Sequence, residues 1–404
     1  MTKVLVTGVG VISNAGITVE DFWTSLTAGS GAFSPPKLAP HLTMRVGSVE
    51  DTTFSEDLPL PSSAALDRSA TLAVAATLRA LTEARISWPL ENSERVAVIF
   101  GNGAGGQETL ETQYRRILVE NRRIHPLTVA RVMVSGCASQ VSMAFGAKGP
   151  CFVTSSACAS SSQAIGTAAT LVRAGAVDVA IAGGAEACLT EGTLLAWDAM
   201  KILSRTKCRP FAKGRDGLLI SEGAGVLILE SEEHAPSRGV RAEIEIAGSA
   251  STADAGDLFQ PSADGMRRAM EMALRDADLA PADIDYVNAH GTGTRSNDVT
   301  ETEAMTFVFG HDRIPPTSST KGVTGHALGA AGAIEAVATV VAMRKRLAPP
   351  TVNFDEPDPQ CNLDCIANSP RPMNIRAALS NSFAFGGLNA TIAFRRADGA
   401  PASR

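Results

Sequence analysis

Cys158 has the type and the setting that nucleophilic catalysis needs. It lies in the run "TSSACASSS", where small residues flank it at the start of an Ala-rich stretch that predicts a helix. Small neighbours let the backbone turn sharply and let a substrate carbon approach the sulfur, and a helix N-terminus favours a thiolate and offers free N–H donors. On this stretch alone, a nucleophile and a buried structural cysteine are equally good interpretations.

Two of the six histidines lie in the most glycine-rich loops of the chain. His290 opens the run "HGTGT", and His326 closes the run "KGVTGH", which begins with Lys321. A single histidine is more often a buried core residue than a catalyst. Two histidines in such loops, combined with Cys158, favour a catalytic interpretation.

The elements that must position these residues alternate along the chain. Apolar runs predict strands in "VLVTGVGVIS", "RVAVIFGNG", "DVAIAGGAEA", "GAGVLILES" and "IDYVNAHGTG". Hydrophobic periodicity predicts helices in "AALDRSATLAVAATLRALTEA", "DGMRRAMEMALRDADL" and "GAAGAIEAVATVVAMRKR". The alternation is typical of an α/β protein whose strands end in glycine-rich loops. A polar stretch at 234–248 indicates a division into two unequal halves.

A glycine cluster near the N-terminus invites a second interpretation. Gly8, Gly10 and Gly16 follow the start of the first strand, but Ser13 stands where a dinucleotide-binding loop has its third glycine. A structural role is therefore favoured over NAD binding.

Composition excludes several classes of protein. The chain has 404 residues, 45% of them hydrophobic, and a formal net charge of −6, so it lacks the basic excess of a nucleic-acid binder. The apolar N-terminal run is too short to span a membrane and has no small-residue cleavage site, which favours a cytoplasmic protein. Seven scattered cysteines without a CxxC pair argue against a disulfide framework or a metal site.

Four motifs together carry a resemblance to a known family. "SSACASS", "NAHGTGT", "TKGVTGHALGAAGA" and "NSFAFGGLNA" occur in this order, and with them the chain resembles the β-ketoacyl-ACP synthases, the Cys-His-His condensing enzymes of fatty-acid and polyketide synthesis. The resemblance covers nearly the whole chain. It implies a thiolase-like α/β fold of five layers, α-β-α-β-α, built from two pseudo-symmetric halves. We expect these halves at 1–235, with Cys158, and at 236–404, with His290, Lys321 and His326.

The resemblance also implies a catalytic role for each motif. Cys158 would take an acyl chain from a carrier-protein thioester, and its own N–H and that of Phe385 would form the oxyanion hole. His290 and His326, both neutral, would stabilise the enolate formed when malonyl-ACP loses carbon dioxide. Lys321 would orient His326 and the local charge network.

Further positions of the family motifs contribute to substrate binding. Glu301 would hold the waters of the charge network, and Thr292 and Thr294 would bind the phosphopantetheine arm. Phe385 would also act as a gate, and Ala384 beside it replaces a glycine that would ease the gating movement.

The acyl pocket and the docking surface depart from the common pattern. Ala104 stands where elongating enzymes often have a larger aliphatic side chain, and Trp197 stands where phenylalanine is usual, which indicates an unusual chain such as a polyene or polyketide. Positive charge is expected where the acidic carrier docks. The basic residues at the matching positions are Arg122, Arg123, Lys201 and Arg68; for Arg122 and Arg123 a solvated charge cluster is an equally good interpretation.

Several alternatives stay open at this point. A degradative thiolase needs a second catalytic cysteine where this chain has "SFAFGGLNA", and a non-catalytic chain-length-factor subunit usually lacks the nucleophile. The enzyme could be a housekeeping fatty-acid synthase II or work in a type II polyketide pathway. We expect the acyl carrier protein as partner, a homodimer or a heterodimer with a chain-length-factor-like subunit, and no cofactor, metal, nucleic acid or membrane.

Overall fold

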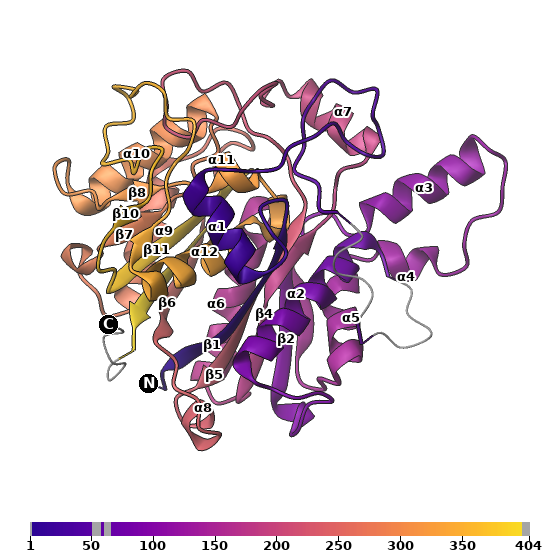
Figure 1. Ribbon diagram of the computed structural model, residues 1–404, viewed down its shortest axis with the longest axis horizontal. Coiled ribbons are helices and arrows are strands. Elements are labelled where there is room, and N and C mark those ends of the chain that lie inside the picture. The colour runs from indigo at the N-terminus through magenta and orange to yellow at the C-terminus, as the bar shows by residue number, and fades with distance from the viewer. Residues whose placement is uncertain (1, 51–57, 60–65, 398–404) are drawn as a thin grey trace.

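A ten-stranded sheet forms the frame of the computed structural model, which describes residues 2–50, 58–59 and 66–397 (Figure 1). Five strands come from the N-terminal part of the chain: β1 (Val4–Ser13), β2 (Val96–Gly101), β3 (Cys151–Thr154), β4 (Val179–Glu186) and β5 (Gly223–Ser231). Five come from the C-terminal part: β6 (Ile244–Ala253), β7 (Tyr286–Asn288), β8 (Thr317–Ser318), β11 (Ala377–Ala384) and β12 (Leu388–Arg396). A separate pair is formed by β9 (Leu347–Ala348) and β10 (Arg371–Pro372).

The two groups of strands repeat one topology. The order is β3-β2-β4-β5-β1 in the first group and β8-β7-β11-β12-β6 in the second, read from the outer edge inwards. In each group the first three strands are parallel and the last two pair antiparallel. The groups meet at β1 and β6, where Leu5 pairs with Glu245. The expected α/β architecture of two related halves is confirmed.

Helices form three layers around the two groups of strands. The helices of the described residues are α1 (Val19–Ala28), α2 (Arg68–Ala84), α3 (Gln107–Leu118), α4 (Thr128–Val132), α5 (Gly136–Phe145), α6 (Ser160–Arg173), α7 (Glu191–Ala199), α8 (His234–Ser237), α9 (Ala263–Asp276), α10 (Arg295–Phe309), α11 (Lys321–Thr324) and α12 (Ala331–Lys345). Helices α2 and α5 cover one outer face, α9 and α10 cover the other, and α6 and α12 lie between the two groups of strands. The division that we propose near residue 235 falls within α8.

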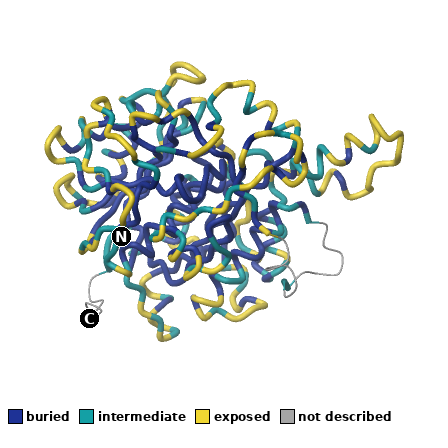
Figure 2. The backbone as a smooth tube through the Cα atoms, turned by 45° about the horizontal axis from the view of Figure 1, so that its top comes forward, coloured by how far each residue is buried: buried dark blue, intermediate teal, exposed yellow. Residues whose placement is uncertain are grey.

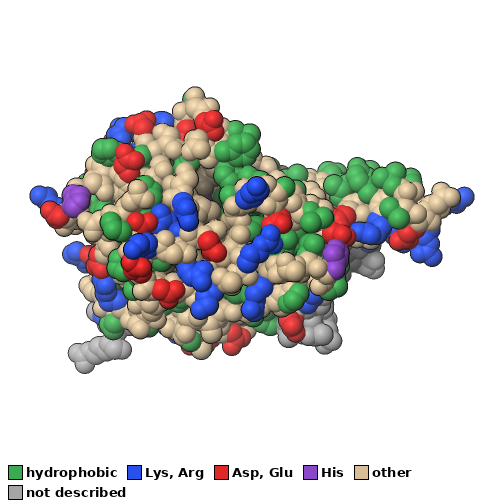
Figure 3. Space-filling view, turned by 90° about the horizontal axis from the view of Figure 1, so that it is seen from above, with side chains coloured by type: hydrophobic (Ala, Val, Ile, Leu, Met, Phe, Trp, Pro, Cys, Tyr) green, Lys and Arg blue, Asp and Glu red, His purple; other side chains and the backbone are tan. Residues whose placement is uncertain are grey.

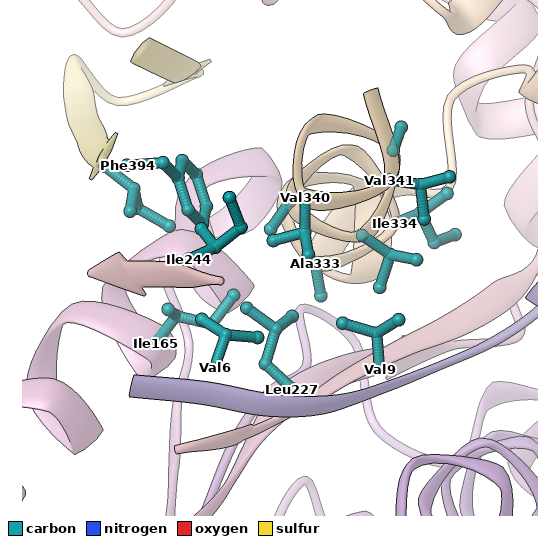
Figure 4. Packing of buried hydrophobic residues seen from close by; sticks show 14 of the residues in the cluster. Val6, Val9, Ile165, Leu227, Ile244, Ala333, Ile334, Val340, Val341 and Phe394 are labelled. Carbon is teal, nitrogen blue, oxygen red and sulfur yellow. The ribbon is translucent and has the colours of Figure 1, made fainter. Parts of the chain in front are cut away.

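The central layer explains the uniform composition of α12. The helix carries small and branched apolar side chains on every face, and all its residues from Ala331 to Met343 are buried. Ile334, Val340 and Val341 pack beside Val9 and Leu227 from the first group of strands (Figure 4). A helix that is apolar on all faces belongs in a core. Burial is continuous through this layer (Figure 2).

The N-terminal glycines have a packing role. Gly8 and Gly10 lie inside β1. A Cβ added at Gly8 would stand 2.3 Å from the Ala80 carbonyl oxygen, and one added at Gly10 would stand 2.0 Å from the Ala76 carbonyl oxygen. They therefore let α2 approach the strand closely. Gly16 closes the turn after β1, where its N–H donates to the Ser13 carbonyl oxygen.

Parallel strands bring the sequence motifs to one side of the molecule. The chain leaves the carboxyl ends of β2, β3 and β4 in the first half and of β7, β8 and β11 in the second. Cys158 follows β3, His290 follows β7, Lys321 and His326 follow β8, and Phe385 follows β11. Because parallel strands end at the same edge, the two halves deliver their motifs to a shared site. In the described part of the chain, every helix is too short or too polar to cross a membrane.

Candidate active site

A cavity of about 690 Å³ contains the residues that the sequence singled out. Cys158, His290 and His326 line it together with Thr292, Thr294, Trp197, Lys201 and Phe385. Cys158 is 6% exposed and the two histidines 1%. One face of the molecule is hollowed, and Lys and Arg side chains lie around the hollow (Figure 3). The cavity therefore connects a buried reactive centre with the surface.

Cys158 stands on a sharp turn between β3 and α6. It is the central residue of the short 3-10 helix Ala157–Ala159, and α6 begins at Ser160. Ala157 has φ +49°, a left-handed conformation that costs a residue with a side chain roughly 1–2 kcal/mol. The Ser160 hydroxyl fixes the turn, because it donates to the Ala157 carbonyl and accepts the Ser156 N–H at 2.9 Å.

His326 is in direct contact with the cysteine. Its Nε2 lies 3.1 Å from Cys158 Sγ, and its Nδ1 accepts the backbone N–H of Leu328 at 3.2 Å. A ring nitrogen that accepts a hydrogen bond carries no hydrogen, so the partners assign the hydrogen of neutral His326 to Nε2. His326 therefore presents a donor to the sulfur.

His290 is held by Lys321, which corrects one sequence-based expectation. Lys321 Nζ donates to the His290 carbonyl oxygen at 2.5 Å and lies 3.4 Å from its Nδ1. The ammonium also forms a buried ion pair with Glu335 of α12. We expected Lys321 to orient His326; it orients His290 instead, because its side chain lies beneath the loop that follows β7. Because the Lys321 ammonium can only donate to Nδ1, the hydrogen of neutral His290 lies on Nε2, which is therefore the donor that faces a substrate.

Glu301 also supports His290, in a different manner from that expected. Its two carboxylate oxygens accept the backbone N–H groups of His290 and Gly291, each at 2.8 Å. The residue is fully buried, and Asn381 Nδ2 lies 3.5 Å from one oxygen. Glu301 therefore supports the His290 backbone directly, and its role in holding waters of the charge network stays a prediction.

Burial governs the protonation states in the site. It raises the pKa of Cys158 to about 12, although Lys321 opposes the rise. Burial and Lys321 together hold the pKa of His290 and that of His326 well below the ordinary value for histidine. The two imidazoles are therefore neutral at pH 7, and the resting thiol keeps its proton.

Three aromatic rings meet at the loop after β11. Phe385 stacks on Trp197 with ring centroids 6.1 Å apart, and Phe259 meets it edge-on at 5.8 Å. Gly386 N–H donates to the Leu258 carbonyl oxygen, so the loop around Phe259 is fastened to the Phe385 loop. Ala384 ends β11 in strand pairing with Leu388, a conformation that does not require glycine.

The other substrate-binding candidates have different surroundings. Thr292 and Thr294 line the cavity, and their hydroxyls lie 2.8 Å apart. Ala104 does not line this cavity; it packs in an adjoining apolar cluster that also contains Trp197, Leu194 and other aliphatic residues. A larger residue at 104 would act on that cluster.

The basic residues do not form one group. Lys201 lines the cavity, whereas Arg122 and Arg123 lie in the exposed loop between α3 and α4, at the end of an arm that projects from the body (Figure 1). Arg68 forms a bidentate ion pair with buried Glu222, and only 18% of its side chain is exposed. This contact favours a structural role for Arg68.

Sequence reasoning missed three residues of the site. Glu335 is the one acidic residue in the apolar run "AIEAVATVVAM", an isolation that signals a buried ion pair. Glu186, in "GGAEA", accepts the N–H groups of Gly103 at 2.7 Å and Gly329 at 3.2 Å. Phe259 carries no sequence signal, because its contact with Phe385 joins distant loops.

The reactive centre contains three side chains of types that can bind a metal ion. The possible ligand atoms of Cys158, His290 and His326 all lie within 4.8 Å of one another, which is close enough for one ion. The ammonium of Lys321 stands beside His290 and repels a cation, so the donor set fits metal binding poorly.

Comparisons with known proteins point in one direction. The family "Beta-ketoacyl synthase, N-terminal domain" matches residues 1–235, and "Beta-ketoacyl synthase, C-terminal domain" matches residues 242–355. Nodulation protein E of Rhizobium sp. (strain N33) is 41% identical over 98% of this chain and 99% of its own length. A 3-oxoacyl-[acyl-carrier-protein] synthase 2 of Synechocystis sp. is 38% identical, covering 98% of each chain. The solved ishigamide ketosynthase/chain length factor is 31% identical with a TM-score of 0.92, over 98% of this chain and 99% of that one.

Proposed function

The chain belongs to the β-ketoacyl synthase family and is a condensing enzyme, and from this premise we propose that it extends a Cys158-bound acyl chain with malonyl-ACP by decarboxylative Claisen condensation. The observation that carries the proposal is the 3.1 Å contact between Cys158 Sγ and His326 Nε2, with His290 in the same cavity. A cysteine and two neutral histidines supply a nucleophile and two hydrogen-bond donors without a strong base.

The first half-reaction transfers the acyl chain to Cys158. The sulfur attacks the carbonyl carbon of the acyl-ACP thioester, the new C–S bond forms, and the pantetheine sulfur leaves with the proton that the cysteine gives up. The N–H donor of His326 faces the sulfur as negative charge develops on it. The N–H groups of Cys158 and Phe385 would stabilise the tetrahedral oxyanion.

The second half-reaction forms the carbon–carbon bond. Malonyl-ACP loses carbon dioxide, and the electron pair of the broken bond forms an enolate whose oxygen accepts hydrogen bonds from Nε2 of His290 and His326. The enolate carbon attacks the acyl-Cys158 carbonyl, and the sulfur leaves as a thiolate that is then reprotonated. Lys321 and Glu301 position His290, and Thr292 and Thr294 bind the phosphopantetheine arm.

Partners and cofactors follow from this chemistry. Both substrates would arrive on the phosphopantetheine arm of an acyl carrier protein, so the enzyme needs no cofactor or metal of its own. Arg122, Arg123 and Lys201 are the docking residues that we propose. The enzyme would act in the cytoplasm as a homodimer or as a heterodimer with a chain-length-factor-like subunit.

We place the enzyme in a type II polyketide pathway, with a polyene among the candidate chains. The large Trp197 ring lines the cavity, and the small Ala104 lies in the same apolar cluster as that ring. This combination favours an unusual acyl chain over a saturated one. The alternative is a housekeeping fatty-acid synthase II, which the 38% identity to a 3-oxoacyl-[acyl-carrier-protein] synthase 2 favours.

Two other functions of related folds fit less well. A thiolase needs a second catalytic cysteine, and among the described residues lining the cavity Cys158 is the only cysteine. A chain-length factor needs no nucleophile, whereas Cys158 here is in contact with His326.

Mass spectrometry of the intact chain after incubation with a panel of saturated and polyene acyl-ACPs tests the proposal. We expect one acyl group on Cys158, none on Cys158→Ala, and faster loading of polyene chains. Ala104→Ile should reduce this preference because it enlarges a side chain in the cluster beside Trp197. Acylation of Cys158→Ala would contradict the assigned nucleophile, and equal loading of all chains by wild type and Ala104→Ile would contradict the polyene assignment.

A further inference from the structure

Two basic side chains at the mouth of the active-site cavity have no partner within the described chain. Lys201 follows α7 in the first half, and Arg295 opens α10 in the second. Both line the cavity and both are exposed, which places them at its outer end. Among the described residues, neither side chain forms a hydrogen bond or an ion pair with the protein. Two cations from opposite halves therefore face the opening uncompensated.

Among the described residues, the two acidic groups that line the cavity form no ion pair with Lys201 or Arg295. Asp216 also lines the cavity, but it lies 3.4 Å from Arg209. Asp254 accepts the Asn389 side-chain amide at 2.7 Å and the Ser262 N–H at 3.1 Å. Unpaired positive charge at the mouth is notable in a chain whose net charge is −6. It favours a ligand that carries negative charge at this depth.

The residues between the cavity mouth and Cys158 indicate which part of a bound substrate would carry the negative charge. Cys158 is 6% exposed and Thr292 5% exposed, Thr294 is half-buried, and Arg295 is exposed. Thr292, Thr294 and Arg295 follow one another within four residues at the start of α10. A linear substrate whose thioester reaches Cys158 and whose middle part passes the two threonines would have its outer end beside Arg295.

Resting on the proposed function, we propose that Arg295 and Lys201 bind the phosphodiester of the carrier's phosphopantetheine arm. This group is the only anion of the arm, and it lies at the end opposite the thiol. A guanidinium binds phosphate oxygens in a bidentate manner, and an ammonium adds a point charge from the other side. The pair would thus recognise the arm itself, independently of the protein surface that bears it.

The proposal separates two sources of negative charge. The acidic surface of the carrier protein could also attract this pair, since Lys201 is among the docking residues that we propose together with Arg122 and Arg123. Small substrates distinguish the phosphate of the arm from the acidic surface of the carrier protein. An acyl-pantetheine and an acyl-4′-phosphopantetheine carry the same thioester and differ only in the phosphate. Neither contains the carrier protein.

The experiment compares kcat/KM of the full-length protein for these two thioesters with one acyl chain. Wild type should prefer the phosphorylated substrate by about tenfold through KM, as a charge-assisted contact predicts. Arg295→Gln should bring the ratio of the two kcat/KM values close to one, Arg295→Lys should keep part of it, and Lys201→Gln should lower it. Rising salt should reduce the wild-type preference.

Arg275→Gln is the matched control, because Arg275 is exposed near the C-terminal end of α9 and does not line the cavity. It should keep the wild-type ratio. The inference would be overturned by a wild-type ratio of one, or by an Arg295→Gln variant that retains the full preference. Failure of both thioesters to acylate wild-type Cys158 would contradict the proposed function, and with it this inference.

Discussion

At the scale of single residues, Glu186 shows how burial makes a carboxyl group sensitive to pH. It has no exposed surface, and one oxygen accepts the N–H groups of Gly103 and Gly329. The other oxygen faces the Cys188 thiol at 3.3 Å. Burial raises the pKa of Glu186 to about 7, although these hydrogen bonds oppose the rise. The folded chain therefore binds a proton here over a pH range in which the unfolded chain has released it.

This shift predicts a pH dependence of stability. A carboxyl whose folded pKa is raised stabilises the fold fully below its unfolded pKa, and the contribution is lost as pH rises towards 7. We expect the free energy of unfolding to fall by up to ~1.4 kcal/mol per pH unit from this group between about pH 4.5 and 7. Glu186→Gln should make the fall shallower, because an amide oxygen can accept both glycine N–H groups. Urea unfolding at a series of pH values measures the slope.

Glu303→Gln, on the exposed side of α10, is the control and should leave the slope unchanged. Glu301, whose pKa burial also raises to about 7, should sustain part of the slope in Glu186→Gln. A Glu186→Gln variant with the wild-type slope would contradict the assignment.

From the sequence motifs, the reacting residues could be identified more readily than the residues that position them. Cys158, His290 and His326 could be chosen because glycine and small residues surround them in the chain. The partner of Lys321 could not, because the choice between His290 and His326 depends on how β7 and β8 lie side by side. Glu186 and Glu335 support the site from strands and helices whose apolar sequences predict only a core.

At the scale of elements, Phe385 is bracketed by rings from both halves. Trp197 belongs to α7, and Phe259 lies in the loop between β6 and α9. A movement of Phe385 away from Trp197 and Phe259 would break both ring contacts. If Phe385 is the gate, its two neighbours hold it closed.

Phe259→Ala tests whether the ring contact between Phe259 and Phe385 restrains the gate. An aromatic pair contributes roughly 0.5–1.5 kcal/mol, so its loss should raise the open population up to about tenfold. We expect faster single-turnover acylation of Cys158 by bulky acyl-ACPs, measured by quenched-flow mass spectrometry. Phe307→Ala is the control, since Phe307 is exposed on α10 and does not line the cavity. Unchanged acylation by Phe259→Ala would show that Phe259 does not restrain the gate.

Most elements follow from local patterns, whereas their symmetry does not. The long apolar and periodic runs become β1, β2, β4, β5, α2, α9 and α12, as expected. The repeated strand order leaves no sequence repeat, because a fold constrains where apolar residues lie and not which ones they are. The two-residue strand β8 is too short for any pattern.

At the scale of the whole molecule, the described residues leave an arm with exposed apolar side chains and an open sheet edge uncovered. The arm formed by α3 and α4 projects from the body and is largely exposed (Figure 2). Leu118 is 78% exposed, Val119 75% and Val129 71%. Strand β3 is the edge strand of the sheet in the same half, with Phe152 39% exposed. Such a surface is typical of a protein interface, and an unpaired strand edge invites another chain.

We expect the protein alone to be a dimer of about twice its 41.9 kDa mass, joined through this surface. Leu118→Asp combined with Val129→Asp should weaken the dimer at least about 100-fold, because each dimer would bury four charges in place of apolar groups. Light scattering over a dilution series measures the change. Phe307→Asp is the control and should remain dimeric. A wild type that is monomeric alone and dimeric only with a chain-length-factor-like subunit would establish the heterodimer.

The division of the centre between two halves also sets an order of events during protein synthesis. The ribosome releases Cys158 long before His290 and His326, which lie 132 and 168 residues further along the chain. The strand that precedes Phe385 emerges later still. Half-made chains thus carry the thiol without its imidazole partners or its gate. The centre that loads and extends an acyl chain is therefore assembled only after His290, His326 and Phe385 have all been synthesised.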